Sequence, residues 1–141
     1  MKNNIRTRTI TASCYHDENF FKKEVATIFN QEWQWVGRSE MLKNPGDFIT
    51  TQIAHYPIIL IKDKSNKTLG FHNVCRHRAS KVILQSEGNC KKIICPYHGW
   101  NYNLDGRLSN PSNFFGSTDF NHKDHSLYPI NIEEKYGLVF A

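Results

Sequence analysis

Two short motifs, each with one cysteine and one histidine, constrain this chain more than any other feature. The first spans residues 75–77 and reads Cys-Arg-His, and the second spans residues 95–98 and reads Cys-Pro-Tyr-His, with 17 residues between them. Thiolate and imidazole are the preferred ligands of zinc and of several iron centres. The motifs therefore predict a metal centre built across two loops that a rigid sheet holds together. The candidate ligands are Cys75, His77, Cys95 and His98.

The order of the ligands separates two kinds of metal site. Structural zinc sites usually keep like ligands together, as Cys-x2-4-Cys and His-x3-5-His. A Rieske [2Fe-2S] cluster instead has two cysteines on one iron and two histidines on the other, which raises its reduction potential to roughly −150 to +300 mV. The mixed order in this chain favours the Rieske cluster. A zinc knuckle and two unrelated buried Cys and His pairs are the alternatives.

The residues around the motifs resemble those of a known family. Residues 70–80 read Gly-Phe-His-Asn-Val-Cys-Arg-His-Arg-Ala-Ser, and residues 95–107 contain Cys-Pro-Tyr-His-Gly-Trp and then Asp-Gly-Arg. Over nearly the whole chain the pattern is similar to the N-terminal Rieske domain of the ring-hydroxylating (Rieske non-haem iron) oxygenases, in their large alpha subunit. The resemblance implies that the two cysteines bind one iron and that His77 and His98 bind the other through Nδ1.

The rest of the sequence predicts a small, mainly β domain after a helical leader. Asp17 is a candidate N-cap for a helix that extends to Trp35, with Gly37 as its stop. Asp105-Gly106 predicts a tight hairpin turn. Apolar or β-branched runs predict strands over residues 48–54, 58–62, 100–104, 127–132 and 136–140. We expect a Rieske-type antiparallel β-sandwich with an N-terminal helix and two cluster-binding loops. Its leader would occupy residues 1–40 and its Rieske domain residues 41–141.

The family resemblance also implies a second iron site. In these oxygenases a mononuclear Fe(II) activates O₂ in a C-terminal catalytic domain, which we expect to be absent from these 141 residues, as in a truncated subunit. Asp119, His122 and His125 form an Asp-x2-His-x2-His pattern with the ligand types of such a site. The family spaces its histidines more widely, so an exposed turn or short helix is the favoured interpretation.

The function implied by the resemblance is electron transfer. The cluster accepts single electrons from a reductase or ferredoxin and passes them to the mononuclear iron, usually of a neighbouring subunit in a homotrimer. That iron then oxygenates an aromatic or quaternary-amine substrate. The alternative is a stand-alone Rieske ferredoxin-type electron carrier. Such carriers lack a helical leader, so the predicted helix favours the oxygenase.

Several residues beside the candidate ligands bear on the reduction potential. Ser80 and Tyr97 stand where quinol-oxidising Rieske proteins have disulfide cysteines, and Trp100 stands where they have a hydrogen-bonding serine. Fewer hydrogen bonds to the cluster sulfurs predict a low-potential cluster. Arg76 and Arg78 are candidates to stabilise the reduced form, with solvent-exposed loop arginines as the alternative.

Composition and charge indicate the compartment and exclude some partners. The formal net charge is +5, but the basic residues are scattered, which is typical of a solvated surface and not of a nucleic-acid site. Residues 1–10 lack an apolar signal segment, and no run approaches the ~18 apolar residues of a membrane span. Cys14 and Cys90 are expected to be free thiols in a reducing compartment. The sequence thus predicts a cytoplasmic protein without nucleic-acid or membrane partners.

Overall fold

The computed structural model describes residues 9–112 and 120–141, and the chain forms two compact units that divide after Glu32. The first unit contains a short helical leader. Its elements are η1 (Ala12–Tyr15), α1 (Glu18–Glu24) and the π-helical turn η2 (Val25–Phe29). No described helix is both long enough and apolar enough to cross a membrane.

The leader helix begins where the sequence predicts and ends earlier. Asp17 is its N-cap, because Asp17 Oδ1 accepts a hydrogen bond of 2.7 Å from the Asn19 N–H. The prediction that the helix extends to Trp35 is wrong, since residues 35–38 form strand β1. Gly37 lies inside that strand and is no helix stop. A Cβ at position 37 would lie 2.5 Å from Ile49 Cδ1, so a larger residue here would require the end of the Ile49 side chain to move.

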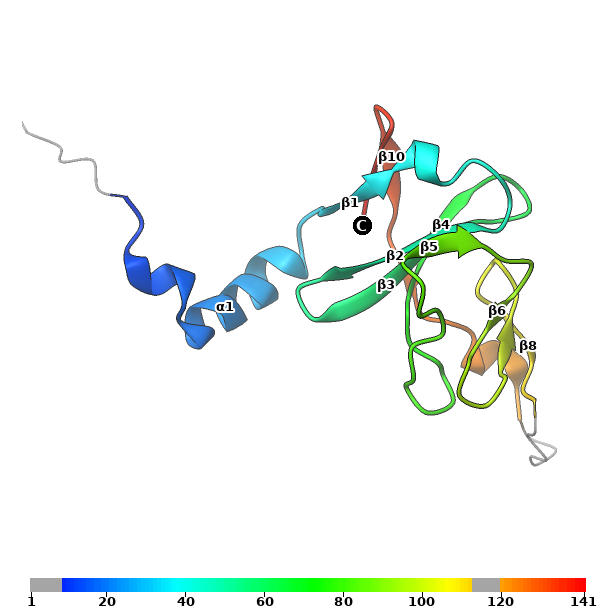
Figure 1. Ribbon diagram of the computed structural model, residues 1–141. Helices are drawn as coiled ribbons and strands as arrows, with labels where there is room; N and C mark the ends of the chain where they lie inside the picture. The colour runs from blue at the N-terminus through cyan, green and yellow to red at the C-terminus, as the bar shows by residue number, and fades with distance from the viewer. Residues whose placement is uncertain (1–8, 113–119) are drawn as a thin grey trace, which may run out of the picture. The chain divides into compact units, whose positions relative to one another are not determined.

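Antiparallel sheets make up the second unit, which confirms the mainly β class (Figure 1). Among the described residues the sheets have the strand orders β5-β2-β3-β4-β9, β1-β11-β10 and β6-β7-β8. The strands are β1 (Trp35–Arg38), β2 (Asp47–Ile53), β3 (Tyr56–Lys62), β4 (Thr68–His72), β5 (Glu87–Asn89), β6 (Ile93–Ile94), β7 (Asn101–Tyr102), β8 (Leu108–Asn110), β9 (Pro129–Ile130), β10 (Glu133–Lys135) and β11 (Leu138–Phe140). Two short helices, η3 (Ser39–Met41) and η4 (His122–His125), lie between strands in the sequence.

The predicted strands agree best with the structure where the strands are long. The runs at 48–54 and 58–62 correspond to β2 and β3, which pair over six residues. The other three runs contain the much shorter β7, β9 and β11. Tyr136 and Gly137 have φ values of 53° and 77°, so they form the turn between β10 and β11 and are not strand residues.

Strand β3 separates two groups of buried side chains. Successive residues of a strand point to opposite faces of the sheet. Accordingly, Ile59 and Ile61 belong to the larger core, while Leu60 belongs to a smaller one. The larger core also contains Phe48, Phe71, Cys75, Val82, Ile83, Ile93, Cys95, Trp100, Tyr102, Leu104, Leu108 and Leu127. Both candidate cysteine ligands are therefore part of the main hydrophobic core.

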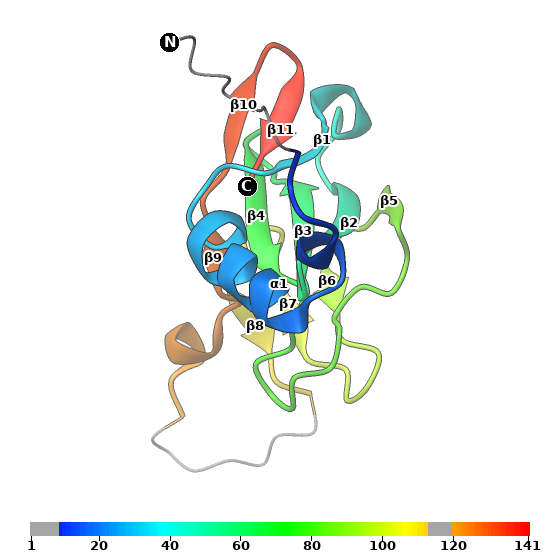
Figure 2. The same ribbon diagram turned by 90° about the vertical axis from the view of Figure 1, so that its left-hand side faces the viewer.

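The candidate loops lie together at one end of the second unit. The β10–β11 hairpin is at the opposite end from the β6-β7-β8 sheet and η4 (Figure 2). The loops that follow β4 and β6, in green and yellow-green, extend at the same end as that small sheet (Figure 1). The topology thus brings segments about 20 residues apart in the sequence to one edge of the domain.

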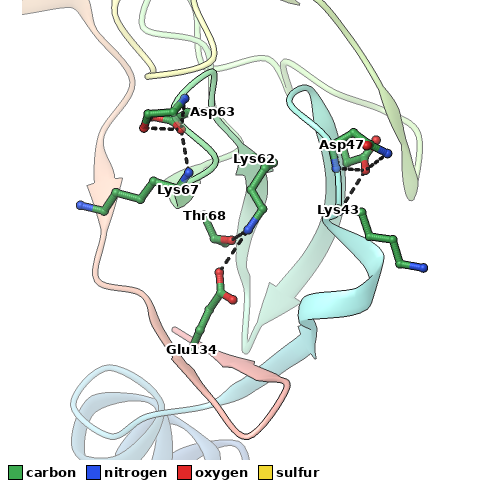
Figure 3. Close-up of polar contacts among 9 residues, drawn as sticks. Lys43, Asp47, Lys62, Asp63, Lys67, Thr68 and Glu134 are labelled. Atoms are coloured by element: carbon green, nitrogen blue, oxygen red, sulfur yellow. Dashed lines mark hydrogen bonds and ion pairs between the residues drawn. The ribbon is translucent and has the colours of Figure 1, made fainter.

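A polar contact joins two of the sheets. Lys62 Nζ on β3 donates a hydrogen bond of 2.9 Å to Thr68 Oγ1 on β4 and lies 3.6 Å from Glu134 Oε1 on β10 (Figure 3). The hydrogen bond of Thr68 with the Glu134 carboxylate lowers the pKa of Glu134, with contributions from Ser39 and from the charge of Lys62. The ionised carboxylate is therefore favoured in the folded state.

The turn between β7 and β8 gives a first prediction. Gly106 has a φ of 78°, and a Cβ there would overlap the ring of Phe71, whereas Gly137 has a φ of 77° with open space around it. We expect Gly137→Ala to lose about 1 kcal/mol of unfolding free energy through backbone strain alone. Gly106→Ala should lose a further ~1–3 kcal/mol through overpacking. Urea unfolding of both variants measures the difference, and equal losses would contradict this packing.

The Glu134 contact gives a second prediction, on the pH dependence of stability. Because the folded-state pKa is lowered, the contribution of the carboxylate is complete above its unfolded value and is lost as the pH falls through the folded value. We expect Glu134→Gln to be less stable than the unchanged chain above about pH 4.5, with the gap closing at lower pH. Urea midpoints from pH 7 to pH 3 test this, with the exposed neighbour Glu133→Gln as the control. A gap that does not change with pH would refute the assignment.

Candidate functional site

The first candidate loop follows β4 and closes through two backbone hydrogen bonds. The Cys75 N–H donates to the Ser80 carbonyl at 2.7 Å, and the Ala79 N–H donates to the Cys75 carbonyl at 2.9 Å. Ala79 has a φ of 54°, in the left-handed region that non-glycine residues rarely adopt. The loop is thus held in one shape by bonds that begin and end at the cysteine.

The second loop repeats this geometry. The Cys95 N–H donates to the Trp100 carbonyl at 2.9 Å, and the Gly99 N–H donates to the Cys95 carbonyl at 2.9 Å. Gly99 has a φ of 71° and, like Ala79, is the fourth residue after the cysteine. The two loops therefore share one backbone design, although the histidine follows the cysteine by two residues in the first loop and by three in the second.

A buried asparagine anchors the segment after the first loop. Asn73 is 2% exposed and comes two residues before Cys75. Its Oδ1 accepts hydrogen bonds of 3.0 Å from the Val82 and Ile83 N–H groups, and its Nδ2 donates to the Ile83 carbonyl at 2.8 Å. A buried amide with these partners holds residues 82–83, which follow the loop, against the segment that precedes it. The role of Asn73 is not apparent from the sequence, where it stands with the polar His72 between Phe71 and Val74.

All four predicted site residues lie in these loops and meet as two pairs. Cys75 and Cys95 are 3% and 2% exposed, and their side chains are close enough to share a hydrogen bond. The rings of His77 and His98 have centroids 4.8 Å apart at an interplanar angle of 67°. Within the described parts of the chain, no three His, Cys, Asp or Glu side chains converge on the position of a single metal ion. The donors are thus arranged as two thiols and two imidazoles.

Burial shifts the pKa of Cys95 and of His77. It raises the pKa of the Cys95 thiol, and the neighbouring Cys75 raises it further. It lowers the pKa of His77, with smaller contributions from His98 and the positive charge of Arg78. The imidazole of His77 is therefore favoured in its neutral form, which has a lone pair to offer a metal.

Tyr102 on β7 contacts the first loop at Cys75 and Arg76. This side chain is fully buried, and its hydroxyl lies 3.3 Å from Cys75 Sγ and accepts a hydrogen bond of 3.1 Å from the Arg76 N–H. Burial, followed by the contact with Cys75, raises the pKa of Tyr102 well above its usual range. The hydroxyl thus keeps its proton and can donate it in a hydrogen bond to the sulfur. Nothing in the local sequence marks Tyr102 for this role.

Aromatic rings cover both histidines. His77 stacks on Trp100 with centroids 4.8 Å apart and an interplanar angle of 9°. His98 lies against Tyr97, with centroids 3.7 Å apart. His98 Nδ1 is buried and has no hydrogen-bond partner among the described residues. A buried ring nitrogen without a partner is unfavourable unless another ligand occupies it. The donor set and this nitrogen fit a [2Fe-2S] cluster with thiolate and imidazole ligands.

The other candidate residues lie outside the two loops. His122 and His125 bound η4, which confirms the prediction of a short helix, and His125 Nδ1 lies 3.0 Å from the Asn121 carbonyl oxygen. Asp119 is outside the described residues. Cys14 and Cys90 are free thiols, as predicted.

Comparison with known protein families matches residues 32–113, more than half of the chain, to the Rieske [2Fe-2S] domain. Among curated proteins, the chain is 36% identical over 126 residues to the glycine betaine monooxygenase oxygenase subunit of Pseudomonas aeruginosa, which covers 89% of this chain and 29% of that protein. It is 36% identical over 133 residues to the carnitine monooxygenase oxygenase subunit of Escherichia coli, with coverage of 94% and 35%. It is 33% identical over 128 residues to the benzene 1,2-dioxygenase alpha subunit of Pseudomonas putida, with coverage of 90% and 28%.

Solved structures show the same relationship. The apo form of a quaternary ammonium Rieske monooxygenase superposes with a TM-score of 0.87 at 32% identity, over 94% of this chain and 38% of that one. Naphthalene 1,2-dioxygenase with bound indole gives a TM-score of 0.84 at 28% identity, over 89% and 29%. The chain spans about a third of the length of these relatives. It belongs to the Rieske [2Fe-2S] domain family, and its relatives are the oxygenase subunits of Rieske oxygenases.

Proposed function

We propose that Cys75 and Cys95 hold one iron of the [2Fe-2S] cluster and that His77 and His98 hold the other. The observation that carries this proposal is the meeting of two buried thiols and two imidazole rings, presented by two loops of the same backbone design. When bound, such a cluster takes up and releases one electron at a time. The Nδ1 of His98, which has no hydrogen-bond partner in the part of the chain that the structure describes, supports the same assignment.

The proposed role of this domain is electron transfer within an oxygenase. The relatives are named as oxygenase or alpha subunits of mono- and dioxygenases, and this chain corresponds to about a third of each. We infer that electrons arrive from a reductase or ferredoxin and leave for a mononuclear non-haem iron elsewhere in a homotrimeric oxygenase. The substrate of that oxygenase would be a quaternary amine or an aromatic compound, since the relatives include proteins named for both.

The burial of the four donors indicates which side of the site exchanges electrons. Both thiols lie in the hydrophobic core, whereas His77 and His98 are only half-buried. Tyr97, which lies against His98, is 58% exposed. The imidazole edges therefore give the shortest route from the interior to the surface, and partners would approach the His77 and His98 side.

The residues around the thiols would keep water away and set the potential. Trp100 is 2% exposed, and Tyr102 is fully buried next to Cys75. A hydrogen bond from Tyr102 to a thiolate sulfur stabilises negative charge there, and more negative charge is present in the reduced state. Tyr102 would therefore raise the reduction potential.

The ligand assignment gives a third prediction. The chain, purified without oxygen, should be red-brown and, after reduction with dithionite, show a rhombic EPR signal with a low average g value. His77→Cys and His98→Cys should retain part of the iron but lower the potential, because thiolate adds negative charge.

The matched control for that experiment is His122→Cys, which changes an exposed histidine outside the two loops. It should leave the iron content, the EPR signal and the potential unchanged. A colourless chain that contains zinc would overturn the proposed function, and so would a His77→Cys variant with the spectrum and potential of the unchanged protein.

The hydrogen bond of Tyr102 gives a fourth prediction. Tyr102→Phe removes the donor to Cys75 Sγ and keeps the ring in the core, so the midpoint potential should fall by roughly tens of millivolts. Tyr136→Phe is the control, because Tyr136 is 93% exposed in the β10–β11 turn. Redox titration followed by visible absorption measures both. If the two variants titrate alike, the Tyr102 hydroxyl has no part in setting the potential.

A further inference from the structure

Arg76, between the two candidate ligands of the first loop, contacts a segment about 50 residues further along the chain. Its guanidinium carbon lies 3.6 Å from the centroid of the Tyr128 ring. One of its terminal nitrogens donates a hydrogen bond of 3.2 Å to the Asp124 carbonyl. The guanidinium is thus held by a ring on one side and a backbone acceptor on another, in the geometry that a planar arginine head favours.

The backbone of Arg76 is held as well, and so is the end of β4 before the loop. The Arg76 N–H donates to the Tyr102 hydroxyl, and the His72 N–H donates to the Tyr128 carbonyl at 2.9 Å. The segment 124–128 therefore contacts Arg76 of the first loop through the Asp124 carbonyl and the Tyr128 ring, and strand β4 through the Tyr128 carbonyl. Within the same segment, His125 also contacts Trp100 of the second loop, with ring centroids 6.0 Å apart.

We propose that Arg76 is a positioning residue whose contact with Tyr128 holds in one place the positive charge of the residue that follows Cys75 and thereby raises the reduction potential of the cluster. This inference rests on the proposed function. Reduction adds one negative charge to the cluster, so a cation held close to it stabilises the reduced form. Among the described residues Arg76 makes no ion pair, so its charge is not cancelled by a carboxylate.

Arg78 provides the contrast. It lies on the other side of His77, carries the same charge and is exposed. Its charge acts on His77, whose pKa it helps to lower, but as an exposed charge it is screened by water and salt. If proximity in sequence were sufficient, the two arginines would affect the potential equally. The structure instead assigns the larger effect to Arg76, because among the described residues only the Arg76 guanidinium is held both by a ring, that of the 57% exposed Tyr128, and by a carbonyl.

The decisive variant changes the ring and leaves every charge in place. In Tyr128→Leu the guanidinium loses its platform, and the midpoint potential should fall although no charge has been removed. We expect about a threefold change in the equilibrium constant for reduction, or about 30 mV at 59 mV per tenfold for a one-electron couple. Tyr128→Phe keeps the ring and should leave the potential unchanged.

Four further variants separate the effect of holding the guanidinium in place from the effect of its charge. Arg76→Gln should lower the potential at least as much as Tyr128→Leu, and the double variant should lower it no further than Arg76→Gln, because both changes remove the same contact. Arg76→Lys keeps the charge without the planar head, so it should titrate below the unchanged domain. Arg78→Gln should have a smaller effect that disappears at high salt.

The measurements are redox titrations of the cluster-loaded chain at low and high salt. The inference is overturned if Tyr128→Leu titrates like Tyr128→Phe, or if Arg76→Gln and Arg78→Gln shift the potential equally. In both cases the chain would still bind a Rieske cluster, so the proposed function would stand. A chain that binds no Rieske cluster would overturn the proposed function and this inference together.

Discussion

The site depends on one backbone constraint, which is the closure of each cysteine loop by hydrogen bonds to the cysteine's own N–H and carbonyl groups. In both loops the fourth residue after the cysteine is left-handed, Ala79 in one and Gly99 in the other. Because each loop closes on its own cysteine, the polypeptide returns to the β-sheet after the loop. The histidine side chains of the two loops then face each other. The main hydrophobic core then buries both thiols, and the imidazoles remain half-buried at the edge.

Contacts from distant parts of the chain support these loops. Asn73 fixes the segment after the first loop, Tyr102 on β7 contacts Cys75, and Arg76 contacts Tyr128. Each contact involves a buried or stacked group whose partner is a sulfur, a backbone amide or a ring. A site that exchanges electrons benefits from such rigidity, because ligands that hardly move need little reorganisation when the charge changes.

The class of fold was predictable from the sequence, and the ligand set that we propose comes from the sequence as well, whereas prediction fails where long-range contacts decide. The mixed order of Cys and His is a local signal, and so are the β-branched runs of β2 and β3 and the Asp105-Gly106 turn. The end of the leader helix is different, because residues 35–38 are taken up by pairing with β11, about 100 residues away. The roles of Asn73 and Tyr102 also depend on partners that only the folded chain brings close. Local periodicity contains no information about such partners.

The central claim is that two histidine nitrogens bind one iron of the cluster while two cysteine sulfurs bind the other. Pulsed EPR of the dithionite-reduced chain, produced with ¹⁵N-labelled histidine, tests it most directly, because only nitrogens bound to iron couple strongly to the unpaired electron. The account predicts two strongly coupled ¹⁵N nuclei, with one lost in His77→Cys and one in His98→Cys. A cluster signal without strongly coupled histidine nitrogen would contradict it.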